Sequence, residues 1–84
     1  MVRPAPGLAW QTIDGEGVVL DLVRGRSLGL NATAALVFSL LETHDEDAIA
    51  DELARRYPVG PDEARDDVRR FVALLKERGL AVDA

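Results

Sequence analysis

Residues 17–34 read GVVLDLVRGRSLGLNATA, and the spacing of their apolar side chains changes at Asn31. Before Asn31 the apolar positions alternate, which is typical of β-strands, and after it they follow the helical period. Asn is also favoured just before a helix, because its side chain accepts a hydrogen bond from the first turn. The stretch therefore predicts two strands, at residues 17–23 and 26–30. A tight turn at Arg24-Gly25 joins them, and Asn31 caps the helix that follows.

The alternation also predicts which side chains share a face of the sheet. In the first of these strands Val18, Leu20 and Leu22 share one face, whereas Asp21 marks the opposite face as partly exposed to water. The second strand divides in the same way, with Arg26, Leu28 and Leu30 on one face and Ser27 and Gly29 on the other.

The N-terminal side of this stretch adds one more strand. Residues 8–13 (LAWQTI) alternate at period two, and the turn signal Asp14-Gly15-Glu16-Gly17 follows them directly. Two prolines and a glycine leave little room for regular structure ahead of this strand, so residues 1–7 are expected to form a short tail. The first third of the chain is therefore expected to form an antiparallel three-stranded meander. Residues 8–84 as a whole are expected to form one domain.

The C-terminal side predicts three helices. The first follows Asn31 as ATAALVFSLLE, and either Thr43 or Asp45 is placed to cap the second, which ends at Pro58. The third helix is bounded by Pro61, which suits the first position of a helix, and by Gly79, which suits the C-terminal end. The resulting order βββααα predicts an α+β domain.

The composition excludes several kinds of function and of site. The chain has 84 residues with 10 basic and 15 acidic side chains, and its net charge of −5 opposes the phosphate neutralisation that drives non-specific nucleic-acid binding. The lack of cysteine excludes disulfides, thiolate metal sites and a cysteine nucleophile. No apolar run approaches the length of a membrane span and no signal peptide is recognisable, so the expected location is the cytoplasm, without a membrane partner.

No group of residues predicts catalysis, a metal site or a bound cofactor. Six acids lie between Glu42 and Glu52, but acids concentrate at helix starts because they complement the helix dipole. The one histidine, His44, lies in a polar stretch with no second histidine or buried acid to orient it. A binding surface is therefore expected, and not an active site.

The third predicted strand, residues 26–30, is placed at an edge of the meander. An edge strand leaves backbone N–H and C=O groups unpaired, and no proline blocks this one, so an extended peptide can add to it as a further strand. Gly29 permits close approach of a second backbone. The alternative interpretation is an ordinary edge, protected by its shortness and by Arg24 and Arg26.

The stretch from Val18 to Leu80 resembles the PqqD-like family, the precursor-peptide recognition elements of ribosomally made and modified peptides. The resemblance rests on three segments in order, VVLDLVRGRSLGLNATAALVFSLLE, AIADELARRY and DVRRFVALLKERGL. Leu30-Asn31 matches the family's Leu-Asn pair before a small-residue helix start, and Gly79-Leu80 matches the end of its third helix. The resemblance implies a winged-helix-like fold of three strands and three helices, with no catalysis and no cofactor.

Members of that family bind the leader segment of a precursor peptide and present it to a modifying enzyme or a leader protease acting in trans. The resemblance implies that the leader adds as a strand beside residues 26–30, in a groove whose other wall is the third helix. Leu28, Phe71 and Leu74 would form its apolar pockets, although Phe71 also continues the core face of its helix. The implied peptide-binding residues are Arg26, Ser27, Leu28, Gly29, Leu30, Asp67, Arg70, Phe71, Leu74 and Arg78.

The residues leave two other functions open. The exposed edge strand also suits self-association, which would make the size of the protein depend on its concentration. The architecture is related to winged-helix DNA-binding domains, although the acids in the first half of the third helix would then face phosphates. Among peptide systems we favour the lasso peptides, because standalone family members there work with a separate leader protease.

Overall fold

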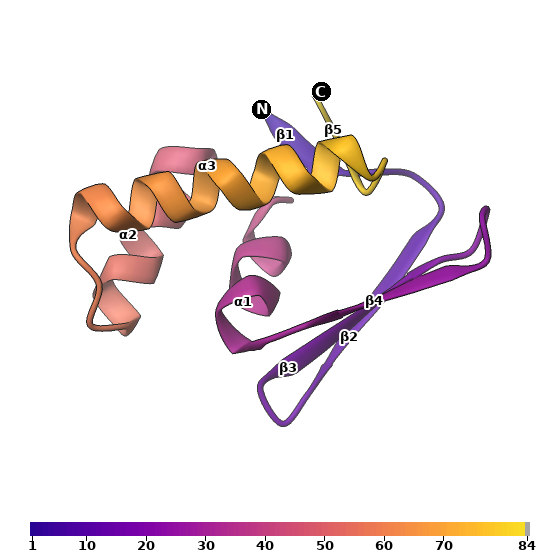
Figure 1. Ribbon diagram of the computed structural model, residues 1–84, viewed down its shortest axis with the longest axis horizontal. Helices are drawn as coiled ribbons and strands as arrows, with labels where there is room; N and C mark the ends of the chain where they lie inside the picture. Colours follow the sequence, from indigo (N-terminus) through magenta and orange to yellow (C-terminus); the bar gives the residue numbers. More distant parts are fainter. Residues whose placement is uncertain (84) are drawn as a thin grey trace.

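The computed structural model describes residues 1–83, in which a three-stranded antiparallel sheet precedes three helices (Figure 1). The predicted α+β order is confirmed. Two further short strands pair the beginning of the chain with its end. The elements are β1 Val2–Pro4, β2 Leu8–Ile13, β3 Glu16–Asp21, β4 Arg26–Leu30, α1 Ala32–Leu40, α2 Glu46–Arg56, α3 Pro61–Glu77 and β5 Ala81–Asp83.

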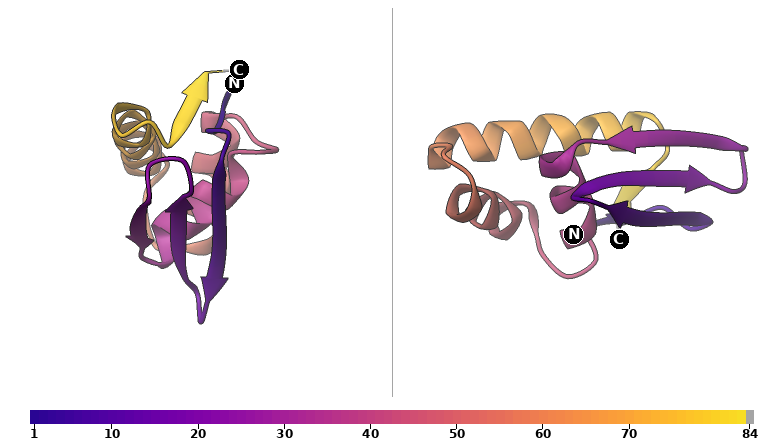
Figure 2. Two further views of the ribbon diagram at one scale, coloured as in Figure 1. Left: turned by 90° about the vertical axis from the view of Figure 1, so that its right-hand side faces the viewer. Right: turned by 90° about the horizontal axis from the view of Figure 1, so that it is seen from below.

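The strands β1 and β5 form an antiparallel ribbon that brings the two ends of the chain side by side (Figure 2). Val2 is buried within it, and the backbone N–H of Ala5 donates to the carbonyl of Leu80 at 3.0 Å. The expectation that residues 1–7 lack regular structure is therefore wrong. A three-residue strand is held by backbone pairing with a distant segment, and Pro4 is tolerated because a two-stranded ribbon has only edge strands.

The register of the three-stranded sheet places Trp10, Val19 and Leu28 in one row across β2, β3 and β4. This face packs against the helices. Val19 is 1% exposed, and the ring of Trp10 meets that of Phe38 in α1 edge to face, with the centroids 5.1 Å apart. The row therefore joins the sheet to the helical layer.

The inward face of β3 carries Val19 and Asp21, whereas Leu20 is exposed on the other face and Leu22 is exposed in the turn that follows. The prediction that Asp21 marks a wet face of the sheet is therefore wrong. Gly17 lies on the same inward face, and a β-carbon there would meet that of Ala35 at 3.0 Å. The glycine thus lets β3 approach α1 closely.

Asp21 is buried because local hydrogen bonds compensate its desolvation. The backbone N–H groups of Val23 and Arg24 donate to its Oδ1 at 3.1 and 3.0 Å. The N–H of Gly25 donates to the Asp21 carbonyl at 2.8 Å. The strand consequently ends two residues earlier than predicted, and residues 22–25 form a wider turn than the predicted Arg24-Gly25 pair.

Side-chain caps begin the first two helices. Asn31 and Asp45 each accept a hydrogen bond from the backbone N–H three residues further on, at 2.9 and 2.8 Å. The cap of α2 is therefore Asp45 and not Thr43. The first helix ends at Leu40, before the predicted Glu42, because its chain continues into a turn.

The end of α3 has the predicted glycine signal. Gly79 has a φ of 74°, its N–H donates to the carbonyl of Lys76 at 3.0 Å, and the next N–H, of Leu80, donates to that of Leu75 at 2.8 Å. These paired bonds satisfy carbonyls that the helix leaves free. They also turn the chain back, so that Leu80 and Ala81 are buried.

The core lies between the inward face of the sheet and the three helices. Burial of each of its large side chains contributes about 1.5–3 kcal/mol. The largest fully buried side chains are Val19, Phe38, Leu41, Ile49, Val68 and Leu75.

Candidate functional site

The strand β4 forms one edge of the three-stranded sheet. It pairs with β3 on one side and, within residues 1–83, with no strand on the other. The prediction of an edge strand at residues 26–30 is confirmed. In an antiparallel pair alternate residues direct their N–H and C=O groups outward, so the free side of β4 presents a row of unpaired backbone groups.

A hollow of about 210 Å³ lies between β4 and the C-terminal end of α3, and we call it the strand hollow. Four of the predicted site residues line it: Arg26, Ser27 and Leu28 from β4, and Arg78 from the end of α3. Leu28 is half-buried and offers apolar surface. The remaining lining residues are Val19, Asp21 and Leu80.

A second hollow, of about 290 Å³, lies between the start of α1, the end of α2 and the first half of α3, and we call it the helix hollow. Asp67 and Phe71 are the predicted site residues that line it. Phe71 is half-buried, so it contributes both to the core and to the hollow. Asn31, which directly follows β4, also lines it. The two hollows therefore lie toward opposite ends of β4.

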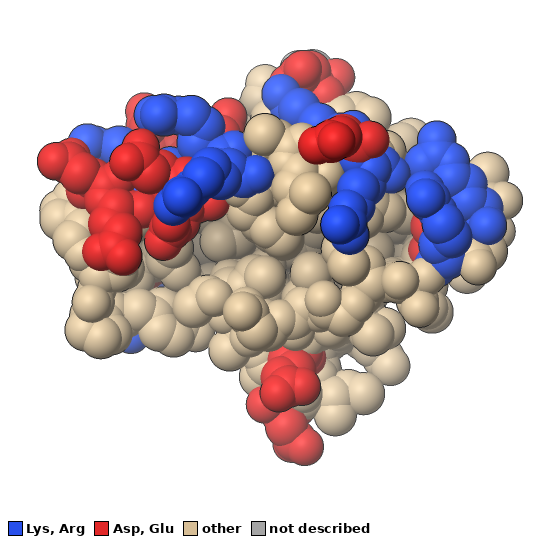
Figure 3. Space-filling view, in the orientation of Figure 1, with Lys and Arg blue, Asp and Glu red and all other residues tan. Residues whose placement is uncertain are grey.

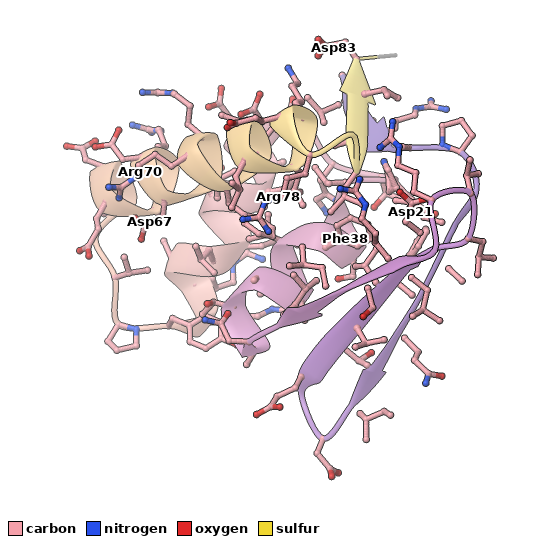
Figure 4. All side chains as sticks on the ribbon, turned by 45° about the vertical axis from the view of Figure 1, so that its right-hand side comes forward. Asp21, Phe38, Asp67, Arg70, Arg78 and Asp83 are labelled. Carbon is pink, nitrogen blue, oxygen red and sulfur yellow. The ribbon has the colours of Figure 1, made fainter. Side chains whose placement is uncertain are left out.

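The other predicted site residues line neither hollow. Leu30 is buried in the core, so only its backbone is available to a ligand, whereas Gly29 faces open space. Leu74 is 38% exposed on α3. Arg70 is exposed, and its guanidinium group pairs with the carboxylate of Asp67 at 2.5 Å. Figure 4 labels both side chains on α3. Asp67 is thus already engaged within the protein.

A set of polar contacts joins the β3–β4 turn to the end of α3. The buried Asp21 carboxylate lies 3.7 Å from the Arg24 guanidinium and 3.8 Å from that of Arg26. Both arginines also donate to the backbone carbonyl of Arg78 at 3.4 Å. Figure 4 shows Asp21 on the sheet side of this junction. Three of these residues, Asp21, Arg26 and Arg78, also line the strand hollow.

Sequence reasoning missed the residues that reach the hollows from the core and from the connections between helices. Asp21 carried a usable signal, because Asp is favoured at the start of a turn, where it accepts backbone N–H groups. The lining of the helix hollow beyond Asp67 and Phe71 carried no such signal, since it depends on how three helices pack. Its unpredicted residues are Asn31, Thr33, Ala34, Val37, Leu53, Tyr57, Val59 and Val68.

The surface between α3 and the sheet is mostly uncharged (Figure 3). Basic side chains gather at the end where the β3–β4 turn lies, and acidic and basic groups are mixed near the start of α3. Within residues 1–83 no group of three or more acidic or histidine side chains is placed to hold a metal ion. No helix in that range has both the length and the hydrophobicity to cross a membrane. The site offers free backbone groups, two hollows and arginines, which suits an extended peptide.

The family of coenzyme PQQ synthesis protein D (PqqD) matches residues 16–81. The chain belongs to the PqqD family. The resemblance seen in the sequence is confirmed, and the match contains β3, β4 and all three helices of the site.

Two solved structures resemble this PqqD-family chain over nearly its whole length. The first, TbiB1 in complex with the TbiA(beta) leader peptide, aligns with a TM-score of 0.90 and 28% identity, covering 98% of this chain and 96% of that one. The second, a lasso peptide synthetase B1 complexed with the leader peptide, has a TM-score of 0.87 and 34% identity, covering 98% of both chains. No curated protein matches the sequence.

Proposed function

We propose that this PqqD-family protein binds the leader segment of a ribosomally made precursor peptide and presents it to a modifying enzyme or a leader protease acting in trans. The observation that carries the proposal is that both similar solved structures are complexes with a leader peptide. The second is a lasso peptide synthetase B1, which favours a lasso-peptide precursor. The proposed role is binding without catalysis, in the cytoplasm, where ribosomally made precursors arise.

In the proposed complex the leader adds as a strand along the free edge of β4. Its backbone pairs with the outward groups of residues 26–30, and side chains on one face of the added strand point toward the helices. Apolar leader side chains enter the strand hollow against Leu28 and the helix hollow against Phe71. Leu74, which is exposed on α3, covers the leader between them.

The energetics favour moderate affinity. Main-chain hydrogen bonds and one or two buried anchors supply the favourable terms, whereas a flexible leader loses conformational entropy on binding. A dissociation constant between tens of nanomolar and tens of micromolar corresponds to roughly −6 to −10 kcal/mol.

A two-dimensional NMR titration of the labelled protein tests the proposal. The ligand is the leader peptide encoded by the precursor gene next to the gene of this protein, and the control is the same peptide with its sequence scrambled. We expect shifts confined to residues 24–31 and 66–78 with the leader only. A folded monomer that shows no shift would overturn the function, and shifts confined to the outer face of β2 and β3 would overturn the site.

A further inference from the structure

The most concentrated positive charge beside the proposed peptide site lies at the β3–β4 turn. Arg26 and Arg78 line the strand hollow. Arg24 and Arg26 both donate hydrogen bonds to the backbone carbonyl of Arg78. We call these three residues the arginine cluster. Asp21 is the only acid that pairs with them within residues 1–83, so the cluster has an excess of two positive charges. Because the whole chain has a net charge of −5, this local excess does not simply reflect composition.

Asp21 makes no direct hydrogen bond to the guanidinium groups of the arginine cluster. Its Oδ1 accepts two backbone N–H groups, and its Oδ2 lies 3.7 and 3.8 Å from the nearest guanidinium nitrogens. These two distances exceed those of direct hydrogen bonds. The carboxylate therefore holds Arg24 and Arg26 in place mainly through its charge.

Most donors of the two turn arginines are unused. Arg24 donates to the Arg78 carbonyl through Nη1 alone, and Arg26 does so through Nη2 alone. Within residues 1–83 their remaining guanidinium N–H groups have no partner. Both side chains are about half exposed, at 53% and 58%. Two held guanidinium groups with free N–H groups match the planar, bidentate geometry of a carboxylate.

We propose that the arginine cluster binds the side-chain carboxylate of an Asp or Glu in the leader peptide, at the position that the added strand places beside Arg26. This inference rests on the proposed function and specifies one end of its ligand. The contact fixes the register, because a one-residue slip of the added strand would turn that carboxylate to the other face. The competing possibility is that the arginines only tie the turn to α3.

A double-mutant cycle measured by fluorescence anisotropy separates the two possibilities. The probe is the labelled leader of the neighbouring precursor gene, and each of its acids is replaced in turn by the corresponding amide. We expect one such replacement and Arg26→Gln each to weaken binding about tenfold, because a hydrogen-bonded charge pair is lost. Together they should weaken it little further. The matched control is Arg55→Gln, which removes an exposed, ion-paired arginine of α2 and should leave affinity unchanged.

The outcomes distinguish this inference from the function on which it rests. A leader that binds the wild type, but has no acid coupled to folded Arg24→Gln or Arg26→Gln variants, would overturn the inference and leave the function intact. A leader without any acid that still binds would do the same. No binding to the wild type would overturn both. Thermal unfolding verifies that each variant is folded, and if Arg26→Gln is not, Arg24→Gln and the peptide replacements decide.

Discussion

The guanidinium group of Arg24 occupies the space into which a β-carbon on residue 79 would project. The φ of 74° favours glycine at this position, and an added β-carbon would also displace the flexible end of the Arg24 side chain. The same arginine hydrogen-bonds the carbonyl of Arg78. The end of α3 and the β3–β4 turn are therefore fitted to each other at the mouth of the proposed peptide site.

Gly79→Ala and Gly25→Ala should cost similar amounts of stability. Both glycines have positive φ, which disfavours any residue with a side chain. A β-carbon on residue 79 would meet only the flexible end of the half-exposed Arg24 side chain, which can move away, and one on residue 25 would face open space. We expect the free energy of unfolding to fall by about 1–2 kcal/mol for either variant. Urea unfolding measures both, and a much larger loss for Gly79→Ala would show that Arg24 cannot move.

Asp21→Ala should destabilise the β3–β4 turn by about 2 kcal/mol, because two backbone N–H groups lose a charged acceptor. Asp21→Asn keeps an acceptor oxygen and should lose about half as much. Asp51→Ala removes an exposed acid from α2 and serves as the control, with a change within about 0.5 kcal/mol. Urea unfolding of the three variants would refute the role of Asp21 if all of them matched the wild type.

Phe38→Ala should lower the free energy of unfolding by about 3–5 kcal/mol, because the ring is 1% exposed and its removal leaves a cavity. Trp10, which packs edge-on against it, is 37% exposed, so Trp10→Ala should cost less. The fluorescence of this single tryptophan provides a direct readout. Its emission should shift to longer wavelength in Phe38→Ala, and an unchanged spectrum would contradict the observed ring contact.

The Asp83 carboxylate pairs with the Lys76 ammonium at 2.8 Å and joins β5 to the last turn of α3. The hydrogen bond and the charge of Lys76 lower the pKa of Asp83 from its ordinary value of 3.8. A carboxyl group with a lowered folded-state pKa adds stability above its unfolded-state pKa and loses that contribution as pH falls through the folded value. The pair should therefore weaken only in acid.

Lys76→Gln tests this assignment. We expect an NMR titration of the side-chain carboxyl carbons to show the pKa of Asp83 rising toward 3.8 in the variant, with carboxyl groups remote from Lys76 unaffected. Identical titration of Asp83 in the two proteins would show that Lys76 does not cause the shift.

Leu74→Asp should abolish leader binding and leave the fold intact. Leu74 is 38% exposed on α3, so the substitution removes apolar contact for the leader without opening the core. Leu20→Asp is the matched control, since Leu20 is 41% exposed but lies on the outer face of β3. Fluorescence anisotropy with the labelled leader should show lost binding for the first variant only. Equal affinities would move the proposed site away from α3.

Local signals in the sequence predicted the order of the elements. Asn31 caps α1, Pro61 begins α3 and Gly79 ends it, because each residue acts through its own backbone or nearest neighbours. The inward face of β3 was predicted wrongly, since the burial of Asp21 depends on a turn that its carboxylate itself organises. Pairing between β1 and β5 joins segments almost a whole chain apart, and no local pattern encodes it.

The candidate site was predictable in part for the same reason. The edge position of β4 follows from the order of strands in a meander, and Arg26, Ser27 and Leu28 line the strand hollow. The helix hollow depends on how α1, α2 and α3 pack, so its lining by residues such as Tyr57 and Val59 could not be predicted from the sequence. Leu30 belongs to the core because its side chain lies on the inward face.

The ribbon of β1 and β5 determines how the protein would respond to mechanical tension on its two ends. Val2 is the partner of Asp83, so a pulling force would enter the ribbon at one end and break its backbone pairs one after another. Such unzipping needs less force than shearing a sheet, in which all pairs bear the load together. The ribbon is therefore expected to open first under tension, before the sheet that carries β4.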